Sequence, residues 1–265
     1  MKAVILAAGA ATRLRPLTDH VPKCLLEVGG VPILRRMLEH LAAFAGAPAR
    51  AIDEVVIVTG YRARQIVDAV AAWRLPLAVQ TVHNDAFDRT NNGSSTLLAR
   101  PHVDGRAFVL MDSDIVCDRD VLAAVLDCPR ADCLALRPAT APGALGAEEM
   151  KVVLDPRGRV AWCAKDVDPR VAAGESLGIN RFSPAASARF FATLDERVRE
   201  RGLVNEYNDA AVQQMIEADG YELWPVDIGA HYATEIDTPE DLRTADAELR
   251  RRQSFTSPCA SLTAL

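Results

Sequence analysis

Apolar runs that end at a glycine or an acidic residue recur along the chain, with helical patterns between them. The runs 2–8, 54–59 and 106–111 are followed by Gly9, Gly60 and Asp112. Uninterrupted apolarity is typical of strands buried on both faces, as they are in parallel sheets. We therefore predict an α/β fold with a doubly wound, mostly parallel sheet and right-handed crossovers.

The pattern changes in the second half of the chain. Residues 151–154 and 159–163 flank a turn at 155–158 and predict a hairpin, which indicates a small antiparallel extension of the sheet. Further strands are expected at 77–82 and 222–226. Helices are expected from Pro32, up to Trp73, over 184–201 and 208–218, and from Thr238.

Charge and cysteine content argue against several classes of protein. The 30 Lys and Arg residues are scattered along a chain of net charge −6, whereas a nucleic-acid binder needs a basic stripe. The six cysteines have neither C-x-x-C spacing nor a zinc-site histidine pair, which favours reduced structural thiols. No stretch reaches transmembrane length, and the first apolar run is too short for a signal core. We expect a cytoplasmic protein with no nucleic-acid or membrane partner.

Small residues and two cations follow the first predicted strand. The stretch Leu6, Ala7, Ala8 and Gly9 is rich in small residues, which let backbone amides approach a base and phosphates. Arg13 and Lys23 supply positive charge for a triphosphate. A dinucleotide-binding loop is disfavoured because it needs G-x-G-x-x-G, and a plain strand-to-helix turn needs neither cation.

Two acidic residues follow the strand at 106–111. Asp112 and Asp114 suit Mg²⁺, which prefers carboxylates together with substrate oxygens, although a solvated turn has the same composition. Ligands of open parallel sheets bind beyond the carboxyl ends of the strands. We therefore expect these acids and the first loop to form one site.

The opening stretch L-A-A-G-A-A-T-R-L-R-P-L-T, with P-K after it, resembles the signature of the sugar-phosphate nucleotidyltransferase superfamily. That signature is L-A-A-G-x-G-x-R-L-x-P…P-K, so Ala11 replaces its second glycine. Residues 91–95 (N-N-G-S-S) resemble a narrower branch of phosphocholine, inositol-phosphate and phosphonate cytidylyltransferases. Similar segments continue to about Ala247, and the resemblance implies a Rossmann-like sheet of nucleotidyltransferase type.

The resemblance also implies roles for individual residues in the first half. Arg13 and Lys23 would act in catalysis. Asn92, Ser95 and Asp112 would lie against the nucleotide, although a serine in this segment is equally suited to capping the following helix.

In the second half, the resemblance implies a metal site and an acceptor site. Asp114 and Asp209 would bind Mg²⁺, with Asp237 as the rival second ligand or as a helix-capping group. The predicted acceptor-binding residues are Lys151, Lys165 and Glu175. The alternative is that the two lysines are ordinary surface residues and that Glu175 is an exposed acid in a loop.

The expected reaction is Mg²⁺-dependent transfer of a nucleoside monophosphate, from CTP by resemblance, to a small phosphate- or phosphonate-bearing acceptor, with release of pyrophosphate. Alternatives are a sugar-1-phosphate nucleotidyltransferase using UTP, GTP or dTTP, and a non-catalytic nucleotide-sensing subunit. We expect one domain over 1–250, with a nucleotide half over about 1–130, an acceptor half over about 131–250 and a flexible tail over 251–265. The sequence leaves the oligomeric state open, a homodimer included.

Overall fold

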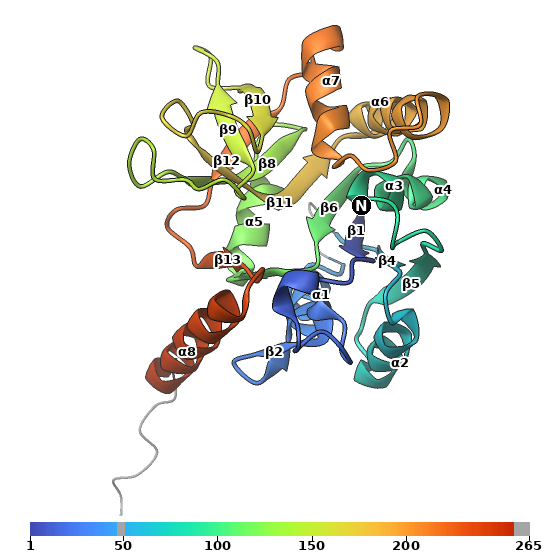
Figure 1. Cartoon of the computed structure of the whole chain (residues 1–265), viewed down its shortest axis with the longest axis vertical. Helices are drawn as coiled ribbons and strands as arrows, with labels where there is room; N and C mark the ends of the chain where they lie inside the picture. The colour runs from blue at the N-terminus through green and yellow to red at the C-terminus, as the bar shows by residue number, and fades with distance from the viewer. Residues whose placement is uncertain (47–50, 257–265) are drawn as a thin grey trace, which may run out of the picture.

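The computed structural model describes residues 1–46 and 51–256 of the chain. Four neighbouring parallel strands form one half of a nine-stranded sheet, in the order β6 (Phe108–Asp112), β1 (Lys2–Ala7), β4 (Glu54–Thr59) and β5 (Ala78–His83). Helices cover both faces of this sheet (Figure 1). The predicted doubly wound, mostly parallel centre is confirmed.

The apolar runs follow from burial on both faces of the sheet. In β1, Ala3 and Ile5 point into one hydrophobic core, while Val4 and Leu6 point into the other. The first core is covered by α1 (Ile33–Ala42), α5 (Arg119–Asp127) and part of α2 (Ala63–Trp73). The second is covered by α3 (Asn92–Leu98), α4 (Arg100–Val103), α6 (Pro184–Asp195) and α7 (Asp209–Asp219).

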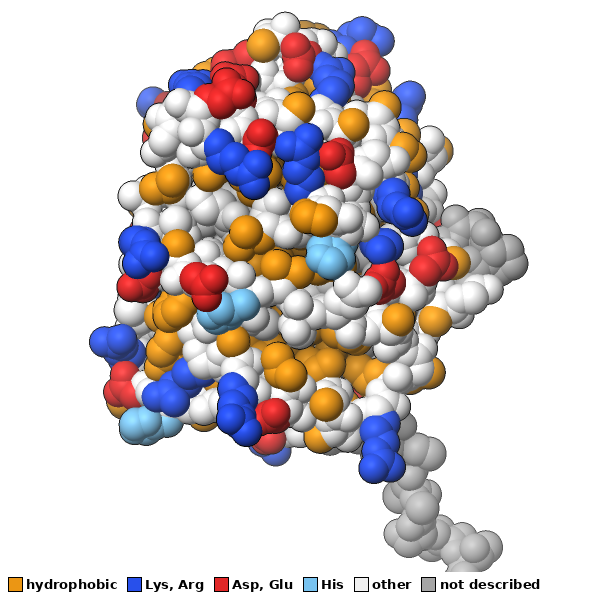
Figure 2. All heavy atoms as spheres, turned by 90° about the vertical axis from the view of Figure 1, so that its right-hand side faces the viewer, with side chains coloured by type: hydrophobic (Ala, Val, Ile, Leu, Met, Phe, Trp, Pro, Cys, Tyr) orange, Lys and Arg blue, Asp and Glu red, His pale blue; other side chains and the backbone are white. Residues whose placement is uncertain are grey.

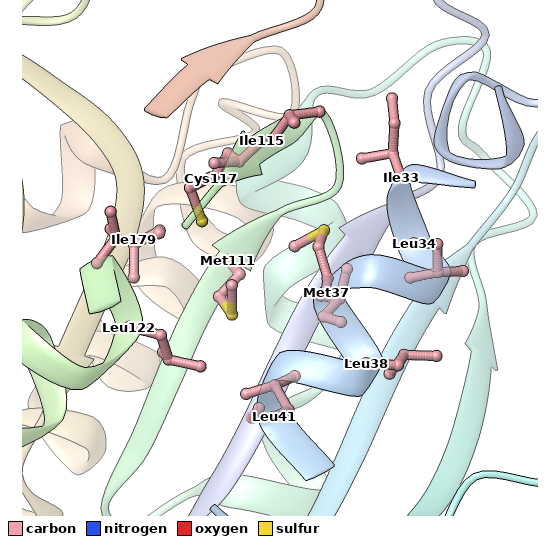
Figure 3. Packing of buried hydrophobic residues seen from close by; sticks show 14 of the residues in the cluster. Ile33, Leu34, Met37, Leu38, Leu41, Met111, Ile115, Cys117, Leu122 and Ile179 are labelled. Atoms are coloured by element: carbon pink, nitrogen blue, oxygen red, sulfur yellow. The ribbon is translucent and has the colours of Figure 1, made fainter. Parts of the chain in front are cut away.

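Helix α1 shows how the first core is packed (Figure 3). Its side chains Met37 and Leu41 lie on the side of Met111 of β6 and Leu122 of α5, whereas Leu38 points away from them, and all five are almost completely buried. Full burial of one such side chain stabilises the fold by about 1.5–3 kcal/mol. The helix begins at Ile33, one position after the predicted Pro32.

The second half of the sheet is more antiparallel than the sequence indicates. Strand β11 (Gly174–Phe182) runs antiparallel to β6 and also pairs with β8 (Cys133–Pro138) and β9 (Lys151–Leu154). The predicted hairpin is confirmed as β9 with β10 (Val160–Ala164). Strands β8 and β11 were not predicted, and β12 (Trp224–Asp227) pairs in parallel with β8.

Two short ribbons complete the strand pairing. Strand β7 (Ile115–Cys117) pairs with β13 (Ala233–Glu235), and Ile236 N donates to Asp114 O at 3.0 Å just beyond this pair. The other ribbon joins β2 (Glu27–Val28) to β3 (Val31–Pro32). The β7–β13 pair therefore brings a late segment of the chain to the end of β6.

Two helix ends differ from the predictions. The α-helix predicted over 184–201 ends at Asp195, and the chain then forms a π-helical turn, Glu196–Glu200. Helix α8 (Pro239–Thr256) continues past Arg251, where the flexible tail was predicted to begin, and extends away from the body of the molecule (Figure 1). The rest of the predicted tail, 257–265, lies outside the described residues.

Strand β5 forms one edge of the sheet, and Figure 2 views the molecule from that side. On this face, Lys and Arg side chains lie among Asp and Glu side chains, with hydrophobic groups between them. Within residues 1–46 and 51–256, no helix has the length and apolar character needed to cross a membrane.

Candidate active site

A cleft of about 280 Å³ opens at the carboxyl ends of β1 and β6. It gathers most of the predicted site residues from segments that are distant in sequence. Those that line it are Leu6, Ala7, Ala8, Gly9, Arg13, Lys23, Asn92, Ser95, Asp112, Asp114, Lys165, Asp209 and Asp237.

The first wall of the cleft is the loop after β1. Ala11 has φ 47° and ψ 54°, in the left-handed region, where a Cβ atom is crowded and glycine is favoured. Its carbonyl accepts from Leu14 N at 3.0 Å and from Thr18 Oγ1 at 2.9 Å, which fixes the turn. The left-handed conformation gives a physical reason for the glycine in the signature, and Ala11 adopts it here despite its Cβ atom.

The end of β4 braces this loop from behind. Tyr61 N donates to Ala8 O at 2.9 Å, and Tyr61 OH donates to the carbonyls of Thr18 and Asp19. A Cβ at Gly60 would lie 2.7 Å from Ala8 O, so only glycine permits this close approach. The backbone of Ala8 is therefore held rigidly at the rim of the cleft.

Lys23 lies between two carboxylates at the floor of the cleft. Its Nζ donates to Asp114 Oδ2 at 2.8 Å and to Asp237 Oδ1 at 2.7 Å. Burial lowers the pKa of Lys23, but the two carboxylates together outweigh this and raise it above its ordinary value. Arg13 NH2 also reaches Asp237 Oδ1, at 3.0 Å.

The two candidates for the second metal ligand have different surroundings. Asp114 and Asp237 converge on one point, the Lys23 ammonium, and Asp114 Oδ1 is buried without a hydrogen-bond partner. Asp209 lies in the first turn of α7, and among the described residues it makes no ion pair with Lys23. Burial raises the pKa of Asp209 to about 6, against the opposing effects of a backbone hydrogen bond and of the Lys165 charge.

Carboxylates outnumber cations in the cleft. Burial, together with Asp114 and Asp209, raises the pKa of Asp112 well above its ordinary value. Burial, together with Asp114, Asp112 and Glu175, does so for Glu235, at the end of β13. A divalent cation would relieve this repulsion. No group of three His, Cys, Asp or Glu side chains in the described part of the chain forms a closed metal cage. The donor set fits a metal that takes further oxygens from substrate.

Asp112 is accommodated by a glycine on the neighbouring strand. Gly178 has φ +62°, and a Cβ there would lie 2.5 Å from Asp112 Oδ2. The residue falls where the pairing of β11 with β8 shifts register, between Ser176 and Asn180. The missing side chain of Gly178 therefore leaves room for the Asp112 carboxylate.

The N-N-G-S-S segment begins α3 and joins the two halves of the molecule. Asn91, not a serine, caps the helix, since its side chain accepts from Asn92 N. Asn92 Oδ1 accepts from Asn208 N at 2.8 Å, which leaves the Asn92 amide nitrogen for another partner. Ser95 Oγ accepts from Asn84 Nδ2 at 3.0 Å. The predicted nucleotide contacts of Asn92 and Ser95 stay predictions, and both residues line the cleft.

Lys165 and Tyr207 form a second wall of the cleft. Lys165 Nζ lies 5.0 Å from the centre of the Tyr207 ring and 3.3 Å from Glu148 Oε2. Glu148 also reaches Arg13 NH1 at 3.2 Å, so one carboxylate bridges cations from both walls.

The structure does not bring Lys151 or Glu175 into the cleft, so their predicted contact with the acceptor is corrected. Lys151 is 1% exposed, and its Nζ donates to the carbonyls of Glu149 at 3.2 Å and Lys165 at 2.6 Å. Glu175 is 3% exposed and forms an ion pair with Arg137. Both side chains lie within the packed strands β9, β11 and β8, where they support the cleft wall.

Glu148, Tyr207 and Glu235 line the cleft but were given no role from the sequence. Glu235 and Tyr207 lie within two positions of predicted site residues, and that proximity was the available signal. Glu148 lies in an irregular segment before β9, and no local pattern indicates its place between Arg13 and Lys165.

Comparison with known proteins identifies the family. Residues 3–210 match the model of the MobA-like NTP transferase domain. The chain belongs to this family. Membership confirms the predicted nucleotidyltransferase assignment at the level of the family.

Relatives of this NTP transferase cover nearly its whole length. CMP-5'-(3-aminopropyl)phosphonate synthase of Streptomyces rubellomurinus is 30% identical over 93% of this chain, which spans 38% of that protein. The solved inositol-1-phosphate CTP transferase of T. maritima has a TM-score of 0.74 at 20% identity, covering 97% of this chain and 98% of that one. The CTP:phosphocholine cytidylyltransferase of Streptococcus pneumoniae gives 0.71 at 22% identity, covering 94% and 98%. The two structures confirm the fold.

Proposed function

We propose that this NTP transferase joins the nucleoside monophosphate of CTP to a small phosphate- or phosphonate-bearing acceptor and releases pyrophosphate. The observation that carries the proposal is the placement of cations on both walls of one cleft. Arg13 and Lys23 lie on the side of the first loop, and Lys165 lies across from them. Two anionic substrates can therefore be held with their reacting groups facing each other.

The reaction is an in-line displacement at the α-phosphorus. An acceptor oxygen forms the new P–O bond, and the bond from the α-phosphorus to the bridging oxygen breaks. The electron pair of the broken bond leaves with pyrophosphate. Because a phosphate or phosphonate oxygen is ionised at neutral pH, no general base is needed. Positioning and charge stabilisation then account for catalysis.

The residues of the cleft divide this work. The backbone around Ala8 and Gly9 approaches the nucleotide, and Arg13 stabilises charge on the triphosphate. Lys23 stabilises charge that develops at the α-phosphorus and holds the two metal-binding carboxylates in place. Lys165 orients the acceptor's anionic group.

Asp114 and Asp237 would hold Mg²⁺, with Asp209 as the rival second ligand. When bound, Mg²⁺ supplies charge neutralisation to the phosphate oxygens. The fit is supported by the buried, unpartnered Asp114 Oδ1 and by the excess of carboxylates in the cleft.

CTP is favoured because the names of the three relatives described above refer to CMP or CTP. The same names give a phosphonate, phosphocholine or inositol phosphate as the acceptor in those relatives. Each is a small molecule with an anionic phosphorus group, which matches a cleft that offers Lys165 to the acceptor.

Pyrophosphate release tests the proposal. The protein and Mg²⁺ are incubated with each of CTP, UTP, GTP and dTTP against a panel of phosphomonoesters, sugar 1-phosphates and alkylphosphonates. Release with CTP and a phosphate or phosphonate acceptor supports the proposal. Release only with another triphosphate and a sugar 1-phosphate would assign the sugar-nucleotide reaction. Nucleotide binding without release for any pair would make the chain a sensor.

A further inference from the structure

The N-N-G-S-S segment, residues 91–95, holds a loop that belongs to the other half of the molecule. The loop, residues 204–208, precedes α7 and carries Tyr207 of the second cleft wall. Peptide groups of an irregular loop cannot pair within a helix or sheet and take their partners from elsewhere in the chain. Here the start of α3, which lies beside the start of α7, supplies them (Figure 1).

The first part of the contact fixes the beginning of the loop. Val204 O accepts from Asn91 N and from Ser94 Oγ, each at 2.9 Å. Asn205 O accepts from Asn91 Nδ2 at 3.3 Å. The oxygen of the same Asn91 side chain caps α3, so one residue fixes both the start of the helix and the start of the loop.

The second part of the contact brackets Tyr207. Glu206 O accepts from Gly93 N at 3.2 Å, and Asn208 N donates to Asn92 Oδ1 at 2.8 Å. The first turn of α3 therefore holds a peptide group on each side of Tyr207. Because Tyr207 is 41% exposed, the position of its ring is set mainly by this backbone and less by packing around it.

Gly93 permits the close approach of the two segments. A Cβ at this position would lie 2.8 Å from Glu206 O and 3.5 Å from Tyr207 C, so a larger residue would push α3 and the loop apart. Helix α3 is anchored in the core by Thr96 and Leu97, which are 0% and 5% exposed. The loop would therefore be the part that moves, and the Tyr207 ring would move with it.

Helix α7 is held in place independently of the loop. Gln213 Oε1 accepts from Cys163 N of β10 at 3.1 Å, and Gln213 Nε2 donates to Ala161 O at 3.4 Å. Met215 of the same helix is completely buried in the second core. A displacement of the loop is thus confined to Tyr207 and its neighbours and is not carried along α7.

Two residues of the N-N-G-S-S segment reach the cleft only through this loop. Three of the five residues in the segment line the cleft, and among the described lining residues neither Gly93 nor Ser94 occurs. A substitution at either position therefore leaves the side chains that face the nucleotide in place and alters the wall that carries Tyr207.

We propose that Gly93 and Ser94 are positioning residues for the acceptor, although they lie in the segment assigned to the nucleotide. They hold the loop 204–208, and the loop places the Tyr207 ring. That ring lies 5.0 Å from Lys165 Nζ, which orients the acceptor's anionic group. The inference rests on the proposed function for this role of Lys165.

A matched pair of variants at Ser94 tests the inference. Ser94→Ala removes the hydrogen bond to Val204 O, whereas Ser94→Thr keeps a hydroxyl that can donate to it. With saturating CTP and Mg²⁺, KM is measured for inositol 1-phosphate and for ethylphosphonate. Ser94→Ala should raise both values about three- to tenfold, the change expected for one lost hydrogen bond. Ser94→Thr should restore the wild-type values.

Gly93→Ala should have the larger effect and raise the acceptor KM more than about tenfold, because it displaces a positioning group. In all three variants, KM for CTP and the calorimetric Kd for CTP should not change. A rise in either CTP value with an unchanged acceptor KM would overturn the inference and leave the reaction intact.

Failure of the proposed function is recognised separately, because no pair of substrates would then release pyrophosphate. Amide hydrogen exchange of residues 204–208 in the full chain then decides the inference. Exchange must be faster in Ser94→Ala than in Ser94→Thr and the wild type, and equal exchange in all three proteins would refute the role of Ser94 in holding the loop.

Discussion

Lys23 and Asp237 are separated by 214 positions in the sequence, yet Lys23 Nζ donates to Asp237 Oδ1 at 2.7 Å. The pairing of β13 with β7 makes this contact possible, because it delivers the chain to the end of β6. The last third of the chain thus supplies one side of a site whose other side is the first loop.

The metal assignment predicts a large effect of Asp237→Asn. The amide keeps an oxygen that accepts from Lys23 but loses the charge, so kcat/KM should fall by more than about 100-fold with the fold retained. Asp209→Asn is the matched comparison and should leave the dependence on Mg²⁺ concentration almost unchanged. The measurement is the initial rate of pyrophosphate release across a Mg²⁺ titration. A shift caused by Asp209→Asn alone would transfer the second ligand to Asp209.

Ala11→Gly is expected to stabilise the protein. The left-handed conformation costs a residue with a Cβ about 1–2 kcal/mol, whereas the extra freedom of glycine in the unfolded chain costs about 0.4–1 kcal/mol. The net gain should be between about 0 and about 1.6 kcal/mol in the free energy of unfolding. Ala11→Val should destabilise the protein, because branching at Cβ worsens the crowding. Urea denaturation of both variants shows whether each raises or lowers the free energy of unfolding. Destabilisation by Ala11→Gly would contradict the inferred backbone strain at Ala11.

Gly178→Ala should lower the free energy of unfolding more than Gly220→Ala does. Gly178 and Gly220 share φ +62°, but an added Cβ meets Asp112 at the first and open space at the second. Backbone strain of about 1–2 kcal/mol is common to both variants. Overpacking against Asp112 should add about 1–3 kcal/mol to Gly178→Ala alone and should lower turnover. Equal losses of stability in the two variants would show that Asp112 moves aside freely.

Glu175 is expected to make stability depend on pH. Burial raises its pKa above the ordinary value, against the opposing effect of Arg137. The folded protein then holds this proton more tightly than the unfolded chain does, so its contribution falls as pH rises above about 4.5. Glu175→Gln removes the titration. The free energy of unfolding of the wild type, minus that of the variant, should decrease between about pH 5 and pH 7. An increase over that range would contradict the raised pKa.

The parallel strands β1, β4 and β6 could be predicted because they are almost entirely apolar. Both faces of β1 and β4 are buried, so their sequences carry no polar interruption. Strand β11 is equally buried but contains Glu175, Asn180 and Arg181. The ion pairs and hydrogen bonds that satisfy these polar groups come from partners elsewhere in the chain. A nine-residue central strand of this composition resembles a surface segment.

The candidate site likewise contains residues that local sequence motifs predict and residues whose role depends on tertiary contacts. Arg13, Lys23 and Asp114 belong to local motifs at strand ends, so their positions follow from the parallel sheet. The resemblance assigned Lys151 to the acceptor, and only the tertiary structure reveals the carbonyls of Glu149 and Lys165 that accept from its ammonium. Whether a lysine faces a substrate or supports a wall is decided by contacts that one sequence does not encode.

The amide of Gln213 has a consequence for the outer edge of β10. A neighbouring strand would offer this edge one N–H and one C=O per peptide group, and the Gln213 side chain offers the same pair to Cys163 N and Ala161 O. An uncovered edge invites a strand from another molecule and leads to aggregation. Here a single side chain of α7 occupies the middle of the edge, so the sheet stops growing within its own chain.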